Sequence, residues 1–496
     1  MKKFLSAVFA FVLIVSILCG CQKAPSKEAV ISKNDGVFQE RIDQTGPPQE
    51  EVQGENPTSI QCSEQFTSTD GSVHFTIDIN KEIAADVNQV IEVAPHRLTE
   101  DDIRRVAKVL LGDVDFYERR SSTNPQYSKA QYQQMISRLS AYSNREALTN
   151  LMGVSGADTY LEYVQKFIES WTRKYETAPT EDPRIPCDWT LKKERHYNDN
   201  EVEIGKRTVA DDSDVLYVNA EKNGIEYIYS VITKDDDGYK VNRLNLNLTE
   251  GLGLYPVDMA IYRSMLCRTE EPTAEQIDTA NIKVQDLLSK MELGQWQISE
   301  TTVEAKQIDD ITEYTIHITA VPNLNGVPAI YGQSAGNLQN AYDATYFMTY
   351  AEFILSANGD IVYFNLDSPL EIIDTRNENV ATLSVAELMK SCIQHLSFSD
   401  ADAYGLPTDV REEIENVSEQ NLLCQVAISD VEYVLGRVKK PDSDDHYYYI
   451  PIMVLNGIVN YIGEKDERCY YTNCHVPSEG IPHLIWINAI DGSIVS

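Results

Sequence analysis

Asn-Gly and Asp-Gly dipeptides recur from residue 223 onward, and they constrain the fold of this chain more than any other feature. They are Asn223-Gly224, Asp237-Gly238, Asn325-Gly326, Asn358-Gly359, Asn456-Gly457 and Asp491-Gly492. These residue types accept the positive φ angles of two-residue hairpin turns. Apolar and polar residues alternate beside them, as in the stretch of Ile225, Tyr227 and Tyr229. The sequence therefore predicts tight hairpins at these positions and an antiparallel sheet.

Three amphipathic helices are predicted before this strand-rich part. The first has Thr99 as its N-cap and Gly112 as its stop. Its apolar stripe consists of Ile103, Val106, Ala107, Leu110 and Leu111. Two more follow between Ser128 and Pro179, the second with Trp171 on its buried side. A half-buried strand, with the alternation of Val73 to Ile79, precedes all three.

Two later helices have capping boxes at their starts. Thr273 stands three residues before Gln276, and Ser384 stands three residues before Glu387. In each pair the two side chains can satisfy each other's free backbone N–H groups. A strand-rich stretch follows each helix, so we predict an α+β fold built from tandem modules of one helix packed on an antiparallel meander. The predicted modules are a mixed N-terminal one at 61–270 (a strand, three helices and antiparallel strands), then helix-plus-meander modules at 271–379 and 380–496.

The N-terminus has the pattern of an export signal. Lys2 and Lys3 precede an apolar run that is too short for a comfortable transmembrane helix, and Leu18-Cys19-Gly20-Cys21 ends it. This ending resembles the lipobox of bacterial lipoproteins. The resemblance implies that residues 1–20 are a cleaved signal peptide and that Cys21 carries a diacylglyceryl group, which anchors the protein to the outer face of the bacterial cell membrane. An ordinary secretory signal with an incidental cysteine is the alternative.

Residues 21–60 are rich in Lys, Glu, Gln, Pro and Gly without sustained periodicity, which predicts a flexible tether behind the lipid. The chain of 496 residues is long enough for two to four domains. Its 42 basic and 77 acidic residues give a net charge of −35. Such a charge excludes nucleic acid as a partner and disfavours electrostatic binding to anionic lipid. The lipid on Cys21 is then the predicted contact with the membrane.

Seven cysteines remain after Cys19 and Cys21 are set aside. Cys392 and Cys424 lie in apolar patterns, which predicts that they are small buried residues. Cys469 and Cys474 bracket four residues of a polar loop and are a possible disulfide. Together with His475 and His483 they could form a zinc site, but their spacing fits no standard short pattern of zinc ligands. No metal or other cofactor is predicted.

One motif suggests catalysis. Gly332-Gln333-Ser334-Ala335-Gly336 matches G-x-S-x-G, the nucleophile elbow of α/β hydrolases. The elbow needs a buried strand before it and a helix after it, whereas Pro328 precedes it closely and the following residues are weak helix formers. A loop within a meander is the simpler interpretation. Asp235-Asp236-Asp237-Gly238 similarly lacks the acidic residues that a calcium loop needs, so a hairpin tip is expected there.

The C-terminal quarter supplies a family resemblance. Tyr447 to Val454 form a Tyr- and Pro-containing strand, and the chain ends on Asn488-Ala489-Ile490-Asp491-Gly492-Ser493-Ile494. This region resembles PepSY-like domains and the membrane-tethered regulators of the Firmicutes wall-homeostasis sensor kinase. The whole layout resembles an uncharacterised family of clostridial surface lipoproteins with a domain of unknown function. The resemblance implies no catalytic residue, and the transmembrane helix of the kinase regulators is not evident here.

The sequence therefore favours a non-enzymatic, lipid-anchored binding or regulatory module outside the cell. We expect a membrane-proximal protein or peptide partner, which could add a strand at an exposed sheet edge around Tyr447 to Leu455. A solute-binding lipoprotein of a transporter is the first alternative, although that class is built from parallel βαβ halves. A serine hydrolase using Ser334 is the second.

Overall fold

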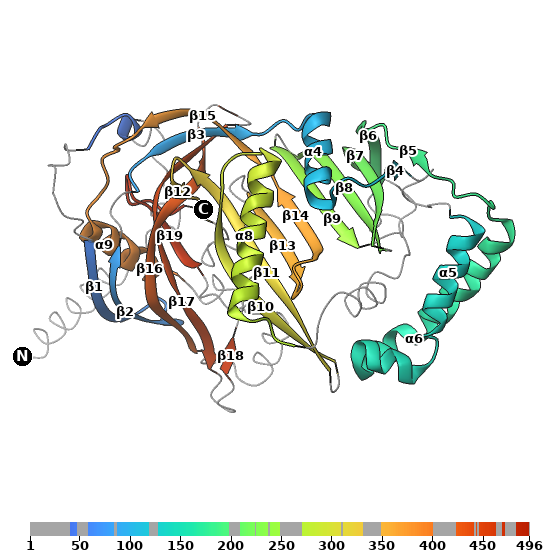
Figure 1. Ribbon diagram of the computed structural model, residues 1–496. Helices are drawn as coiled ribbons and strands as arrows, with labels where there is room; N and C mark the ends of the chain where they lie inside the picture. Colours follow the sequence, from blue (N-terminus) through green and yellow to red (C-terminus); the bar gives the residue numbers. More distant parts are fainter. Residues whose placement is uncertain are drawn as a thin grey trace, which may run out of the picture.

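The computed structural model describes the greater part of the chain. The residues described are 40–46, 58–83, 87–118, 127–197, 209–223, 225–236, 239–248, 270–308, 311–330, 349–399, 423–440, 443, 446–462, 469–471 and 483–495. They form two large sheets with helices packed on them, so the predicted α+β class is confirmed (Figure 1). Among the described strand pairs only one, β2 with β16, is parallel. The parallel βαβ halves expected of a transporter's solute-binding protein are therefore not what the described sheets contain.

The larger sheet has eleven described strands and runs through the middle of the molecule. Its main path is β10 (Trp296–Ile308), β11 (Ile311–Leu324), β13 (Tyr350–Ser356), β14 (Ile361–Asp367), β9 (Tyr239–Leu248), β8 (Ile225–Asp236), β7 (Val209–Lys222), β4 (Phe116–Glu118) and β5 (Ile185–Pro186). Two short strands lie off this path: β12 (Val327–Pro328) pairs with β11, and β6 (Lys192–Tyr197) pairs with β7. The pairing of β14 with β9 crosses the predicted module boundary at 270, so the modules at 61–270 and 271–379 share one sheet.

The smaller sheet has eight described strands and joins the two ends of the chain. Its main path is β1 (Thr58–Thr67), β2 (Val73–Ile83), β16 (Leu423–Lys439), β17 (Tyr447–Ile462), β3 (Val90–Pro95) and β15 (Leu370–Asn377), while β18 (Cys469–Tyr471) and β19 (His483–Asn488) also pair with β17. The two C-terminal strands β16 and β17 therefore lie between the N-terminal strands, with β1 and β2 on one side and β3 on the other. The predicted module at 380–496 thus completes a sheet that the N-terminal strands begin.

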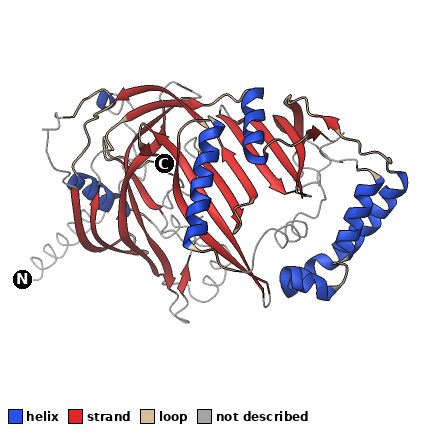
Figure 2. Ribbon diagram, viewed as in Figure 1, coloured by secondary structure: helices blue, strands red, loops and turns tan. Residues whose placement is uncertain are grey.

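Helices cover one face of each sheet. Figure 1 shows α4 (Glu100–Leu111) and α8 (Ala274–Met291) side by side over the larger sheet, and α9 (Val385–Leu396) beside β1 and β2 of the smaller one. The remaining described helices, α5 (Lys129–Ser140) and α6 (Arg145–Thr177), pack on each other at one end of the molecule around their own cluster, which includes Val164 and Trp171 (Figure 2).

The helix starts are where the sequence predicts them. Thr99, Thr273 and Ser384 are N-caps whose side chains accept a hydrogen bond from the N3 backbone N–H, and each N3 side chain accepts one in return from the cap's N–H. These boxes satisfy backbone donors that a helix start leaves free. The apolar stripe of α4 is fully buried, as predicted from its spacing.

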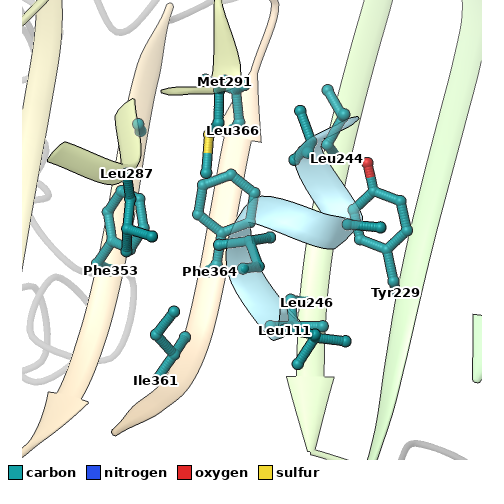
Figure 3. Close-up of a cluster of buried hydrophobic side chains, with 14 of the residues drawn as sticks. Leu111, Tyr229, Leu244, Leu246, Leu287, Met291, Phe353, Ile361, Phe364 and Leu366 are labelled. Atoms are coloured by element: carbon teal, nitrogen blue, oxygen red, sulfur yellow. The ribbon is translucent and has the colours of Figure 1, made fainter. Parts of the chain in front are cut away.

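The apolar core of the molecule lies between α4, α8 and the larger sheet. Figure 3 shows Phe353 and Phe364 of the sheet facing Leu287 and Met291 of α8, with Leu111 of α4 close by. The two phenylalanine rings lie 4.8 Å apart between centroids, a contact distance typical of aromatic pairs. Every second residue of β13, β14 and β9 enters this core because successive side chains of a strand point to opposite faces.

Most of the predicted hairpin turns are confirmed. Asn325 and Gly326 have φ angles of 53° and 90° between β11 and β12, and Asn223 has a φ of 54° between β7 and β8. Gly359 and Gly492 also have positive φ angles in turns between antiparallel segments. Asp237-Gly238 lies outside the described residues, between the paired strands β8 and β9.

Asn456-Gly457 is not a turn, and that prediction is wrong. Both residues lie inside β17, where Asn456 pairs with Asp430 and Gly457 pairs with Ile428 across a bulge in β16. Asn456 is buried, and its side-chain amide donates to Glu432 over 3.2 Å. The chain continues straight here because β16, β19 and β18 pair with β17 on both sides of this position.

The expected docking edge at Tyr447 to Leu455 is also wrong. These residues are in the middle of the smaller sheet, paired with β16 on one edge and with β3 and β19 on the other. Tyr447, Tyr448 and Tyr449 are at most 3% exposed. The stretch is apolar on both faces, which is the pattern of a central strand rather than an edge strand.

The predicted tether at 21–60 is packed on the folded body at one described point. Ile42 is 0% exposed, in a cluster with residues such as Val380 and Tyr448. The Gly46 N–H donates to the Asn379 carbonyl over 2.7 Å, and Thr45 forms a β-bridge with Val380. Asn377 Nδ2 also donates to the Ile42 and Gln44 carbonyls, so an apolar contact and several hydrogen bonds hold this segment, and β1 already begins at Thr58.

Candidate functional site

The second face of the larger sheet is polar, although much of it is buried. On β9, β14, β13 and β11 the residues that alternate with the apolar core carry amide, carboxyl, phenol, guanidinium, hydroxyl and imidazole groups. We call this the polar sheet face, and it consists of Arg243, Asn245, Asn247, Thr315, His317, Tyr350, Glu352, Tyr363, Asn365 and Asp367. A sheet with one solvated face normally exposes such groups. Here Asn365 is 3% exposed and Asp367 is 6% exposed.

The strand register brings these residues into rows. In the central row Asn245 of β9 pairs with Asn365 of β14, and Asn365 pairs with Glu352 of β13. Ser230 and Thr319 extend the row to β8 and β11. Directly opposed side chains on one face are close enough to interact, so five strands contribute polar groups to one line across the sheet.

An ion pair borders the row on one side. The Arg243 Nε–H donates to the Asp367 carboxylate over 3.0 Å and 3.2 Å. Asn365 Nδ2 donates to the same carboxylate over 3.3 Å and to the Tyr350 hydroxyl over 3.2 Å. The Arg243 side chain remains half exposed, whereas the Asp367 side chain is buried. The ion pair therefore links a buried carboxylate to a guanidinium group that solvent can reach.

Two further asparagines form a second chain of hydrogen bonds on β9. Asn247 Nδ2 donates to Asn245 Oδ1, and Asn245 Nδ2 donates to the Tyr363 hydroxyl over 3.2 Å. On the next strands, His317 Nε2 lies 2.7 Å from Glu304 Oε2 and 3.0 Å from Thr315 Oγ1. These contacts fix the side chains around the central row in single orientations.

Two acceptors in the centre of the row differ from their neighbours. Asn365 Oδ1 is buried, and no residue in the described part of the chain donates to it. Glu352, the cross-strand partner of Asn365, has no ion pair among the described residues, and burial raises the pKa of its carboxyl against the opposing effect of His317. Buried acceptors are normally satisfied by a partner, so Asn365 Oδ1 is suited to accept a hydrogen bond from a bound molecule. The carboxyl of Glu352, which is only partly buried, can accept another beside it.

Most side chains of this face are hydrogen-bonding groups that do not titrate near neutral pH. Amide and phenol side chains donate and accept hydrogen bonds without exchanging protons near neutral pH. A buried carboxyl with a raised pKa is a common feature of binding and catalytic sites alike. No group of three or more His, Cys, Asp or Glu side chains is placed to share a metal ion in the part of the chain that the structure describes.

The sequence-predicted site residues lie elsewhere or outside the described residues. Cys21, Ser334 and Cys474 are outside them. Cys469 begins β18, and its side chain is not described. The strand that contains Cys469 belongs to the smaller sheet, not to the sheet with the polar sheet face. Of the described helices, none is both long and apolar enough to cross a membrane.

Cys392 and Cys424 are fully buried, as predicted. Both belong to the apolar cluster between α9 and the smaller sheet, and burial raises the pKa of the Cys392 thiol. They act there as small apolar side chains.

The polar sheet face was not predicted from the sequence, although one signal for it exists. In Leu244-Asn245-Leu246-Asn247 asparagine occupies alternate positions of a strand. Asparagine is depleted in strands because its side chain competes for backbone hydrogen bonds. Its repetition on one face therefore indicates that the amides have partners across the sheet.

Comparison with known proteins gives no family. No protein-family model matches the chain, and no curated protein matches it. Among solved structures, the chain is similar to the crystal structure of an uncharacterised protein from Eubacterium rectale ATCC 33656. The identity is 10%, the TM-score is 0.33, and the match covers 93% of this chain and 99% of the other.

Proposed function

We propose that this protein is a non-catalytic binding protein of the bacterial cell surface, which holds a polyhydroxylated ligand on the polar sheet face. The observation that carries the proposal is the pair of Glu352 and Asn365 in the central row. Asn365 Oδ1 is buried without a donor among the described residues, and the Glu352 carboxyl beside it forms no ion pair with them.

A ligand rich in hydroxyl groups fits this arrangement best. Hydroxyls donate to acceptors such as Asn365 Oδ1 and the Glu352 carboxyl, and they accept from amides such as those of Asn245 and Asn247. The phenols of Tyr350 and Tyr363 lie on the same face and offer ring surface beside the polar groups. Sites that combine a few fixed polar groups with aromatic surface are typical of small-molecule recognition.

A binding experiment with matched variants tests the proposal. Purified protein is titrated calorimetrically with neutral oligosaccharides (maltotriose and the trimer of N-acetylglucosamine) and, for contrast, with spermidine. We expect a neutral saccharide to bind, with an affinity roughly tenfold lower in Asn365→Leu and Glu352→Gln. The first variant loses the acceptor of Asn365, and the second replaces one carboxyl oxygen of Glu352 by an NH2 group that cannot accept a hydrogen bond. Glu371→Gln, at a glutamate of the exposed edge strand β15, is the control and should bind normally.

Two results would contradict the proposal. If spermidine binds while the saccharides do not, the face recognises positive charge rather than hydroxyl groups. If all variants bind a saccharide as the wild type does, the ligand lies on another surface.

The cellular address is proposed from the lipobox-like sequence at Cys21. A diacylglyceryl group there would keep the binding face near the outer surface of the membrane. Cys21→Ala should move the protein from the membrane fraction to the soluble fraction or leave the precursor unprocessed. Membrane association that is unchanged and still requires detergent would exclude this anchor.

A further inference from the structure

A second candidate binding site lies on the opposite side of the larger sheet, where the turns of two hairpins meet the end of one helix and the middle of another. It is a hollow of about 260 Å³ between the C-terminal end of α4, the middle of α8, the β7–β8 turn and the β13–β14 turn. We call it the lysine hollow, after Lys222 and Lys283 in its wall.

The floor of the hollow is apolar. Leu110 and Leu111 of α4, Ile225 and Tyr227 of β8, and Ile361 of β14 are all buried residues of the main core. Burial raises the pKa of Tyr227 to about 12, so its hydroxyl stays protonated at neutral pH. A hydrocarbon group in the hollow would cover this apolar surface and leave the polar rim available.

The rim carries an excess of positive charge. Lys222 and Lys283 line the hollow together with a single carboxylate, that of Asp360. Lys283 Nζ donates to the Gly359 carbonyl over 2.5 Å, which holds the ammonium beside the β13–β14 turn. Burial lowers the pKa of Lys283, Lys222 lowers it further, and Asp360 opposes them. Asp360 acts on the Lys283 ammonium more strongly than Lys222 does, and the three charged groups line one hollow.

This local charge is opposite to that of the whole chain, whose net charge is −35. Two ammonium groups and one carboxylate around an apolar floor leave one positive charge in excess, and a bound anion neutralises it. We propose that the lysine hollow binds a short-chain aliphatic carboxylate, with the carboxylate between Lys222 and Lys283 and the alkyl chain on the floor formed by Leu111 and Ile361. The size of the hollow, at the lower end for ligand sites, suits a small molecule of this kind.

Calorimetric titration of the purified full chain tests this site, with sodium hexanoate, sodium acetate, inorganic phosphate and hexylammonium chloride as probes. We expect hexanoate to bind most tightly, acetate and phosphate more weakly because they cannot use the apolar floor, and hexylammonium not at all. Lys283→Gln and Lys222→Gln, on separate elements, should each weaken hexanoate binding roughly tenfold, the effect of losing one charged hydrogen-bond donor.

The matched control is Lys290→Gln on the same helix. Lys290 pairs with Asp286 over 2.5 Å and does not line the hollow, so this variant should bind hexanoate like the wild type. Glu352→Gln should also leave hexanoate binding unchanged, which separates this site from the polar sheet face. The proposal is wrong if the wild type does not bind hexanoate, if phosphate binds more tightly than hexanoate, or if Lys290→Gln weakens binding as much as Lys283→Gln does.

Discussion

The two faces of the larger sheet are made by the same strands, yet they are buried in different ways. On one face Phe353 and Phe364 are covered by α8, and the contacts are apolar and close. On the other face Asn365, the neighbour of Phe364 in sequence, is held in a hydrogen-bonded network that leaves its Oδ1 without a described donor. Glu352, the neighbour of Phe353, forms no ion pair with the described residues, and burial raises the pKa of its carboxyl. The apolar face contributes stability through burial, whereas the polar face keeps unsatisfied groups that lower stability unless something binds to them.

The largest effect should come from the apolar face. Phe364→Ala removes a ring that is 0% exposed and packs against Phe353, so we expect the free energy of unfolding to fall by about 3–5 kcal/mol. Urea unfolding followed by circular dichroism measures this loss. A loss below about 1 kcal/mol would mean that the core collapses around the missing ring, and the apolar face would then not be the main source of stability.

A smaller loss is expected one residue further along the same strand. Asn365→Ala removes the two hydrogen bonds that its Nδ2 donates, but it also removes the acceptor that has no described donor. We expect the free energy of unfolding to fall by about 1–2 kcal/mol, measured in the same way. If Asn365→Ala is as damaging as Phe364→Ala, the polar network is a structural element of the core and the contrast between the faces disappears.

The smallest effect should be a gain. Because burial raises the pKa of Glu352 above its value in the unfolded chain, the folded state holds this proton more tightly, and stability falls as pH rises through the raised pKa. Glu352→Gln removes that penalty. We expect the melting temperature of the variant to exceed that of the wild type by roughly 1–3 °C at neutral pH.

The same comparison at lower pH supplies the control. At about pH 4 the wild-type carboxyl is largely protonated, and the two melting temperatures should converge. If the difference in melting temperature between the variant and the wild type is the same at acidic and neutral pH, the charge of Glu352 is not its cause. A variant that is more stable but binds less ligand is the combination expected of a functional residue.

Features that depend on neighbouring residues could be predicted from the sequence. The capping box of Thr273 and Gln276 and the apolar stripe of α4 are local patterns, and both are present in the structure. The turn at Asn325-Gly326 is local as well, since only two residues separate its strands.

Features that depend on residues far away in the sequence could not be predicted in this way. Asn456-Gly457 has the same composition as a hairpin turn, but strands from elsewhere in the chain pair with β17 on both sides of it. The polar sheet face depends on the register of β9 against β14, which are more than a hundred residues apart, so Asn245 and Asn365 give no sign in sequence that they are neighbours. The polar alternation of each strand predicts a solvated face, and only the assembled sheet shows that it is buried.

In the smaller sheet C-terminal strands lie between N-terminal strands, and this arrangement determines when each strand can find its partners during synthesis of the chain. β2 can pair with β1 as soon as both have left the ribosome, but its other neighbour, β16, begins only at Leu423. β3 must likewise wait for β15 and β17. The earliest strands therefore remain with open, aggregation-prone edges until almost the whole chain has been made. The smaller sheet is thus begun first and completed last, and a chain that stops short of β17 lacks the strand to which β16, β3 and β19 all pair.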